Sequence, residues 1–296
     1  MATEIPPLRL PDRPADGHKG TFGSVLIVAG SLGMSGAAAL AGLGALRGGA
    51  GLVYLAVPES IAPIVASIEP SYLTIPLPED KTGKLSIAAC PHLFDRGRFM
   101  EAVAIGPGWG QSDDLRRIVT QMYAQLECPM VVDADALNLL AGAPESLSEH
   151  AGQRILTPHP GEFARLDNVD TPLIQADRRS IAAAFAERTR TVVLLKGRET
   201  VITDGKTTYV NPTGNSGMAT GGTGDVLTGL ITALLAQGLP PLEAARTGAY
   251  LHGLAGDLAA SHFSEPALIA SDLPRYLGRA WKVVLNRQSA GEPNAT

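Results

Sequence analysis

The chain is predicted to be an α/β protein with a doubly wound, mainly parallel sheet and helices on both faces. Apolar runs recur along the sequence, and most are followed by glycine or proline; they lie at 24–30, 51–57, 102–108, 129–135, 154–158 and 191–197. Helical patterns lie between and after them, at 35–46, 112–126, 173–188, 223–237 and 242–260. Runs that are apolar throughout are typical of strands buried on both faces, which favours parallel pairing.

The domain organisation is expected to be simple. One compact domain is predicted over residues 18–285, with a flexible N-terminal segment at 1–17 and a disordered tail at 286–296. Two short β-branched runs, at 200–204 and 207–211, are separated by Gly-Lys and predict a β-hairpin at an edge of the sheet.

Composition and charge argue against several classes of protein. The net charge is −5 and the isoelectric point is about 5.7, so a basic face for nucleic acid is not expected. The N-terminus lacks the apolar stretch of a signal peptide, and no apolar run reaches the roughly 18 residues of a membrane span. Cys90 and Cys128 lie far apart and match no metal-ligand spacing. We therefore expect a cytoplasmic protein that binds neither nucleic acid nor membrane.

The carboxyl ends of the predicted strands are rich in glycine and polar residues. Ligands of open α/β sheets bind beyond these ends. The segments that follow the strands read GSLGMSG, GPGWG, DADALN, TPHPGE, KGRET and NPTGNSGMATGGTGD. Any one of them is explained equally well as a good turn. Together they predict one composite site.

The segment GMATGGTGDVLTG, at 217–229, places a glycine-rich loop before a helical pattern. Free backbone N–H groups at a helix N-terminus attract anions, and phosphate is the natural guest. The segment matches neither the GxxxxGK[ST] phosphate loop nor the GxGxxG dinucleotide fingerprint.

Asp225 follows the last glycine of this loop, and two interpretations are about equal. It either stabilises the positive end of the helix dipole or takes a proton from a hydroxyl that attacks phosphorus. The second role needs the carboxylate form, and an ordinary aspartate with a pKa near ~3.9 has that form at pH 7 without adjustment.

Other strand ends carry further candidates, each with a simpler alternative. His159, between two prolines, either faces the cleft or is structural. Glu162 either favours the start of a helix or holds Mg²⁺ through water. Lys196 either neutralises a phosphate or is an exposed turn residue. Asp135 and Ser35 are expected to cap the helices that follow them.

Several of these strings together resemble a known family, the nucleotide-dependent NAD(P)H-hydrate dehydratases. The resemblance rests on HKG, VLIVAGSLGMSGAAALAGLGALRGGAGLV, IGPG, VVDADALN, LTPHPGEF, LKGRETVI and NPTGNSGMATGGTGDVLTG, and it extends from His18 to LHGLAGD at 251–257. Members often carry an N-terminal epimerase domain, and this chain resembles the stand-alone dehydratase form. The resemblance implies a ribokinase-like fold.

The resemblance also implies a reaction. The S form of NADH or NADPH hydrate is phosphorylated on its ring hydroxyl and loses phosphate, which restores NADH or NADPH. ADP is the expected co-substrate, giving AMP and phosphate, whereas eukaryotic members use ATP. Mg²⁺ is the expected cofactor, and a homotetramer is the expected assembly.

The resemblance assigns roles to individual residues. Asp225 would take the hydroxyl proton, and Gly222 and Gly224 would stabilise charge on the transferring phosphoryl group. The residues implied for nucleotide binding are Lys196, Gly197, Arg198, Glu199, Thr200 and Gly224. The residues implied for the hydrate pocket are Ala37, Ala38, Gly108, His159 and Asp225.

Two positions depart from related patterns. Small-molecule kinases have Asn-x-x-Glu where this chain has His159-x-x-Glu162, which weakens the case for Glu162 as a metal ligand. Trp109 stands where leucine is more usual, and it either stacks on a ring or fills space. Two other functions stay open: a hydroxymethylpyrimidine or thiazole kinase of the same fold, and a non-catalytic nucleotide sensor.

Overall fold

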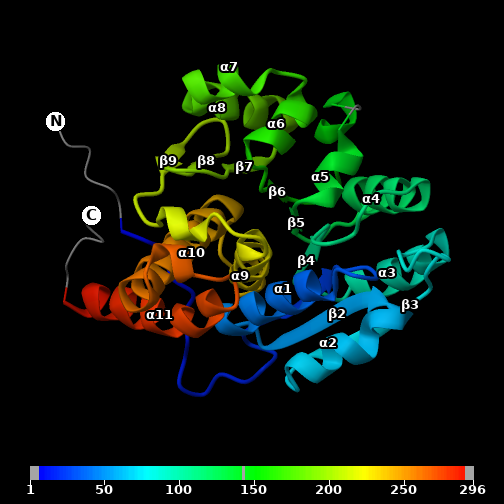
Figure 1. Ribbon diagram of the computed structural model, residues 1–296, viewed down its shortest axis with the longest axis horizontal. Helices are drawn as coiled ribbons and strands as arrows, with labels where there is room; N and C mark the ends of the chain where they lie inside the picture. Colours follow the sequence, from blue (N-terminus) through cyan, green and yellow to red (C-terminus); the bar gives the residue numbers. More distant parts are fainter. Residues whose placement is uncertain (1–6, 142–143, 291–296) are drawn as a thin grey trace.

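The computed structural model describes residues 7–141 and 144–290, and within them nine strands form one sheet (Figure 1). The strands are β1 (Ser24–Val28), β2 (Leu52–Pro58), β3 (Leu73–Leu77), β4 (Ala102–Ile105), β5 (Met130–Val132), β6 (Arg154–Leu156), β7 (Val192–Leu195), β8 (Val201–Thr203) and β9 (Thr208–Val210). Their order across the sheet is β3-β2-β1-β4-β5-β6-β7-β8-β9.

Parallel pairing joins all neighbours from β3 to β7, and β8 and β9 follow as an antiparallel hairpin at the edge. The predicted doubly wound, mainly parallel sheet and the predicted hairpin are both confirmed. From β1 the chain moves outward to β2 and β3, and it then returns to place β4 on the other side of β1. The strand order therefore reverses between β1 and β4, and open α/β sheets bind ligands at the carboxyl ends beside such a reversal.

Helices cover both faces of the sheet. One layer contains α1 (Ser35–Gly48), α2 (Ala62–Ile68), α9 (Thr223–Ala236), α10 (Pro241–Phe263) and α11 (Asp272–Ser289). The other contains α3 (Cys90–Gly97), α4 (Asp113–Gln125), α5 (Asp135–Leu140), α6 (Pro160–Asp167), α7 (Thr171–Ala176) and α8 (Arg178–Thr189). Side chains of β1 alternate between the layers, with Val25 and Ile27 in the first core and Leu26 and Val28 in the second. This alternation explains why the strands are apolar throughout.

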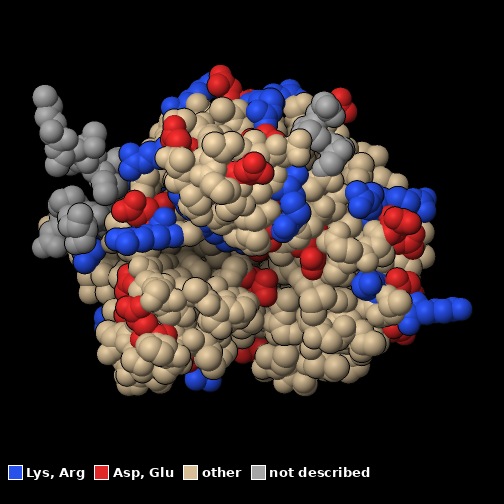
Figure 2. Space-filling view, turned by 45° about the horizontal axis from the view of Figure 1, so that its top comes forward, with Lys and Arg blue, Asp and Glu red and all other residues tan. Residues whose placement is uncertain are grey.

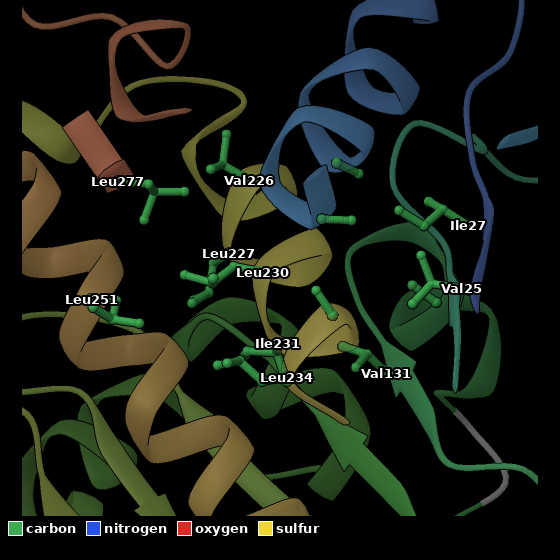
Figure 3. Close-up of a cluster of buried hydrophobic side chains, with 14 of the residues drawn as sticks. Val25, Ile27, Val131, Val226, Leu227, Leu230, Ile231, Leu234, Leu251 and Leu277 are labelled. Carbon is green, nitrogen blue, oxygen red and sulfur yellow. The ribbon is translucent and has the colours of Figure 1, made fainter. Parts of the chain in front are cut away.

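Helix α9 lies inside the first layer, and every residue from Val226 to Ala236 is buried. Figure 3 shows its side chains between Val25 and Val131 of the sheet and Leu251 and Leu277 of the outer helices α10 and α11. A helix that is apolar on all sides suits such a central position, because it has no face to present to water.

Glycines allow α1 and α9 to approach backbone to backbone. A Cβ at Gly229 would lie 1.8 Å from the carbonyl oxygen of Ala41, and one at Gly44 would lie 2.2 Å from that of Val226. The small-residue sequence of α1 therefore fixes how closely α9 packs, and with it the position of the α9 N-terminus.

The structure corrects the predicted helix over 173–188. It is divided into α7 and α8, because Asp177 has non-helical torsion angles and its carboxylate accepts the backbone N–H of Ser180 over 3.1 Å as an N-cap. Strand β3 and the helices α2, α3 and α11 are not among the elements predicted from the sequence.

The segments at the two ends of the described chain pack against the domain. Leu8 is buried, and the carbonyl oxygens of Leu8 and Arg9 accept hydrogen bonds from Gln288 and Thr247. Helix α11 continues to Ser289, so residues 286–289 of the predicted tail are helical, which corrects the expected boundary. Residues 1–6 and 291–296 lie outside the described part. No helix among the described residues is long and apolar enough to cross a membrane.

The close approach of α1 and α9 generates a prediction about stability. Gly229→Ala is expected to destabilise the protein by ~1–3 kcal/mol, because the added methyl group meets the α1 backbone, which cannot rotate away. Gly278→Ala in α11 is the matched control: it is exposed, nothing lies within 4 Å of the added Cβ, and helix propensity alone should stabilise the protein by ~0.5–1 kcal/mol. Urea denaturation measures both changes, and equal stability of the two variants would contradict the proposed packing constraint.

Candidate active site

The glycine-rich loop leads into α9 as predicted. Gly222 is the N-cap residue, with φ +92°, a left-handed conformation that glycine adopts without strain. No atom lies within 4 Å of the position that a Cβ of Gly221 would take, so the loop is open there. Thr223 Oγ1 donates to the carbonyl oxygens of Met218 and Thr220 over 3.0 and 3.1 Å, which holds the loop against the helix start. The N–H groups of the first turn make this end suited to an anion.

Asp225 lies in the first turn of α9 and is largely buried, not a surface aspartate. Burial is the main cause that raises its pKa to about 7; the Asp133 carboxylate adds to the rise, and the Lys196 ammonium opposes it. Asp135 and Glu162 make smaller contributions in the same direction as burial. The expectation of an ordinary aspartate pKa is therefore wrong, because the sequence does not reveal the buried acidic neighbours.

Lys196 lies among these carboxylates. Its Nζ donates to Asp133 Oδ1 over 2.8 Å and is 3.8 Å from Glu162 Oε2. Thr228 Oγ1 donates to the other oxygen of Asp133 over 2.7 Å. Burial disfavours the charged amine, but the surrounding carboxylates outweigh it and raise the pKa of Lys196. Two strand ends and two helices thus supply a single charged cluster.

Gly224 lies beside this cluster. A Cβ there would be 3.4 Å from Lys196 Nζ and 3.8 Å from Asp133 Oδ2. The structure therefore brings the glycine loop, Lys196 and Asp225 together, as the sequence analysis expects. Sequence reasoning misses Thr228, although its position three residues after Asp225 places both on one face of a helix.

His159 is the N-cap residue of α6. Its Nδ1 accepts the backbone N–H groups of Gly161 and Glu162 over 3.0 and 3.3 Å, so the ring proton is on Nε2. Nε2 is 3.3 Å from Glu162 Oε1, and Glu162 Oε2 accepts the His159 backbone N–H over 2.8 Å. About half of the His159 side chain is exposed, so a structural role leaves one ring edge available to a ligand.

The loops after β1 and β4 meet at the reversal of strand order. Gly30 N donates to the Pro107 carbonyl over 2.7 Å, and Ser31 Oγ donates to that of Gly108 over 2.8 Å. A Cβ at Gly108 would lie 2.7 Å from that of Ala37, so the two residues are neighbours. Ala38, however, is buried in the core, so its side chain does not line an open site.

The turn Lys196–Thr200 is exposed from Gly197 to Glu199. Gly197 has φ +142°, and a Cβ there would lie 2.7 Å from Arg178 Nη1. Arg178 Nη2 donates to the carbonyl oxygens of Leu195 and Lys196 over 2.8 and 3.2 Å. This arginine, which the sequence analysis does not single out, holds the turn in place.

The carboxylates do not form a ready metal site. Within the described residues, no group of three or more His, Cys, Asp or Glu side chains is arranged to hold a metal ion. Both oxygens of Glu162 face His159, and the Lys196 ammonium is the cation nearest Asp133. The expected role of Glu162 as a magnesium ligand therefore finds no support in this geometry.

Two helix caps differ from expectation, and Trp109 takes one of its two expected roles. Met34, not Ser35, is the N-cap residue of α1, and Ala134, not Asp135, is that of α5. Asp135 instead accepts the backbone N–H of Gly110 over 2.8 Å. Trp109 is fully buried and donates to the Val28 carbonyl, so it fills the second core.

Charged side chains of both signs lie on one face of the molecule. Figure 2 shows lysine, arginine, aspartate and glutamate side chains interspersed on the face that it presents. A cavity of about 850 Å³ lies elsewhere, at the amino ends of β5, β6 and β7, beside residues such as Pro129, Gln153 and Val192. None of the predicted site residues lines it.

The chain is similar to proteins of one known family. Residues 25–279 match the model of the protein family described as NAD(P)H-hydrate dehydratase. The chain is 48% identical over 271 residues to a bifunctional NAD(P)H-hydrate repair enzyme of Moorella thermoacetica, covering 91% of this chain and 51% of that protein. It therefore spans about half the length of this bifunctional relative.

A second relative matches over nearly its whole length. The ADP-dependent (S)-NAD(P)H-hydrate dehydratase of Bacillus subtilis is 38% identical over 275 residues, which is 92% of this chain and 94% of the relative. A crystal structure of the ADP/ATP-dependent NAD(P)H-hydrate dehydratase from B. subtilis, co-crystallised with ATP/Mg²⁺, superposes with a TM-score of 0.80 at 35% identity, covering 93% of this chain and 94% of that one. The ribokinase-like fold is thereby confirmed.

The raised pKa of Asp225 predicts how stability depends on pH. An unfolded aspartate titrates near ~3.9, whereas the folded site titrates at about 7, so the folded protein holds this proton more tightly. That contribution to stability is fully present below about pH 4 and is lost as pH rises through 7. Asp225→Asn, which has no proton to lose, is expected to be more stable than wild type by up to ~4 kcal/mol above pH 7, with the difference shrinking towards pH 4.

Denaturation midpoints at several pH values measure this difference. Asp95→Asn makes the same chemical change at an exposed position of α3 and is the control. If the Asp225→Asn curve ran parallel to that of wild type from pH 4 to 8, the raised pKa would be refuted.

Proposed function

Because the chain belongs to the NAD(P)H-hydrate dehydratase family, we propose that it removes water from the S form of NADH or NADPH hydrate in a nucleotide-dependent reaction. ADP is the proposed phosphoryl donor, and AMP and phosphate are the other products. The relative that matches over nearly its full length is named ADP-dependent, which supports this choice. The observation that carries the proposal is the buried carboxylate of Asp225 beside an open glycine loop and a lysine.

The nucleotide binds with its phosphates at the N-terminus of α9. The N–H groups around Gly222 and Gly224 face the phosphoryl group, and the helix dipole favours its negative charge. Lys196 is adjacent to Gly224 and adds a positive charge. The turn from Gly197 to Thr200 follows directly and contacts the rest of the nucleotide.

Phosphoryl transfer then uses Asp225 as the base. The ring hydroxyl oxygen attacks the terminal phosphorus of ADP, a P–O bond to AMP breaks, and AMP leaves with the electron pair. The hydroxyl proton passes to the Asp225 carboxylate, whose pKa of about 7 is well matched to neutral pH. In this step the chain orients the reactants, accepts a proton and stabilises developing charge.

Elimination completes the reaction. The C–O bond breaks and phosphate takes the electron pair, while the lone pair of the ring nitrogen stabilises the resulting cation. Loss of a proton from the neighbouring ring carbon restores the double bond of NADH or NADPH. The balance is hydrate and ADP converted to reduced cofactor, AMP and phosphate.

We propose that the hydrate pocket lies at the reversal of strand order. Ala37 and Gly108 are neighbours there, and about half of the His159 side chain is exposed. His159 is neutral near pH 7, since burial and the nearby Lys196 lower its pKa. Its Nε2–H therefore serves as a hydrogen-bond donor.

Magnesium and assembly follow from the resemblance alone. Mg²⁺ would neutralise charge on the nucleotide phosphates, and no step above depends on it. A homotetramer is the proposed assembly, which sedimentation of the purified protein tests. The cytoplasm is the proposed location.

Removal of the proposed base is expected to reduce turnover and to leave nucleotide affinity largely unchanged. Asp225→Asn is expected to reduce turnover by roughly 10²-fold or more, because proton removal from the hydroxyl is lost. Nucleotide affinity, measured by calorimetry, should stay within a few-fold of wild type, since the amide keeps the shape of the site. Wild-type turnover in this variant would remove Asp225 from the mechanism, and Asp95→Asn is again the control.

The pH dependence of the wild-type rate gives an independent prediction. Activity requires the Asp225 carboxylate, so kcat/KM should rise with pH through about 7 and then level off. A profile that is flat between pH 5 and 8 would argue against this base.

A substrate comparison separates the dehydratase from its alternatives. With hydrated NADH or NADPH, absorbance of the reduced cofactor should return in the presence of ADP, and more slowly with ATP. Phosphorylation of a hydroxymethylpyrimidine or thiazole without return of this absorbance would instead identify a kinase. Nucleotide binding without either reaction would identify a sensor.

A further inference from the structure

One side of α10 faces the whole glycine-rich segment before α9. His252 is 8% exposed, and its Nε2 is 2.8 Å from the carbonyl oxygen of Thr223. Thr213 Oγ1 donates to the Tyr250 carbonyl over 2.9 Å. Asp257 accepts Gly214 N and Asn215 Nδ2, each over 2.9 Å. His252 and Asp257 belong to the LHGLAGD segment of α10, and their partners lie in the loop after β9 and at the start of α9. The reaction described above assigns no role to His252 or Asp257.

Glycines of α10 allow this close contact. A Cβ at Gly253 would lie 2.3 Å from Thr213 Oγ1, and one at Gly256 would lie 2.2 Å from Met218 Sδ. At these two positions α10 has no side chain, so Thr213 and Met218 of the loop pack directly against its backbone. His252 and Asp257 are left as the polar groups that fix the two halves of the loop.

The protonation state of His252 follows from its surroundings. A carbonyl oxygen only accepts hydrogen bonds, so Nε2 must carry a proton and donate it to Thr223. Burial lowers the pKa of His252 to about 4, so near pH 7 the ring is neutral. The contact is therefore a neutral N–H···O=C hydrogen bond in a buried setting, where such bonds are strong.

The hydrogen bond to the Thr223 carbonyl also determines where the Gly224 N–H points. The Thr223 carbonyl and the Gly224 N–H belong to one peptide unit, which is planar and trans. A group that holds the carbonyl oxygen on one side of this unit also holds the N–H pointing to the other side. The hydrogen bond further polarises the peptide and strengthens its N–H as a donor.

We propose that His252 is a positioning residue for the reaction, which aims the Gly224 N–H at the transferring phosphoryl group through the Thr223–Gly224 peptide. This rests on the proposed function, because the phosphoryl group is the one transferred to the hydrate. Asp257 holds the preceding part of the loop, and His252 holds the peptide next to Asp225.

Substitutions at His252 separate positioning from packing. His252→Leu keeps an apolar side chain of similar size and removes the donor, whereas the side-chain nitrogen of His252→Gln stands the same number of bonds from Cα as Nε2. We expect kcat to fall roughly tenfold or more in the leucine variant and to recover largely in the glutamine variant, with KM for the hydrate little changed. Thr247→Val, which removes the buried hydrogen bond from α10 to Arg9 away from the loop, is the stability control.

A second measurement does not depend on turnover. The backbone amide resonance of Gly224, followed by NMR during titration with ADP, should shift strongly in wild type and in His252→Gln, and weakly in His252→Leu. If wild type shows no dehydratase activity but this pattern holds, the proposed reaction fails while the positioning role stands.

Two outcomes would overturn the proposal. One is a folded His252→Leu variant whose kcat and Gly224 shift equal those of Thr247→Val. The other is a folded glutamine variant that is as impaired as the leucine variant, since a returned donor would then have no effect.

Discussion

The position of α9 is the constraint on which the site depends. Glycines fix its distance from α1, apolar contacts fix it against the sheet, and α10 covers its outer side. Because its sides are covered, α9 is open to a ligand at its N-terminus. This end meets the carboxyl ends of the strands. The phosphate loop, Asp225 and Thr228 therefore take their places from core packing, and hydrogen bonds within the loop and from the loop to α10 add to it.

The site holds more carboxylates than ammonium groups. One ammonium group, that of Lys196, lies among the carboxylates of Asp133, Glu162 and Asp225. Asp133 is satisfied by Lys196 and Thr228, and Glu162 by His159, whereas Asp225 has the pKa that rises to about 7. The same crowding that makes Asp225 a useful base disfavours its charged form, so a reactive group is maintained at the expense of stability.

Patterns that repeat along the sequence predict the fold and the main site of this protein, whereas individual side-chain contacts are not predicted. Apolar runs reveal the sheet and its parallel strands, and the glycine loop with its aspartate reveals the main site. Edge strand β3 is less buried and gives a weaker signal, and Asp177 divides a helix that periodicity joins. The pKa of Asp225, the burial of Ala38 and the reach of His252 depend on residues far away in sequence, which no local pattern contains.

The two ends of the described chain are fastened to each other. Gln288 of α11 donates to the carbonyl oxygen of Leu8, and Arg9 is hydrogen-bonded to α10 beside it. The described chain therefore ends close to where it begins, and the fold does not require the chain to start and end at this place. A circular permutant that joins these ends by a short linker and opens the chain at an exposed turn would retain every strand pairing and both cores.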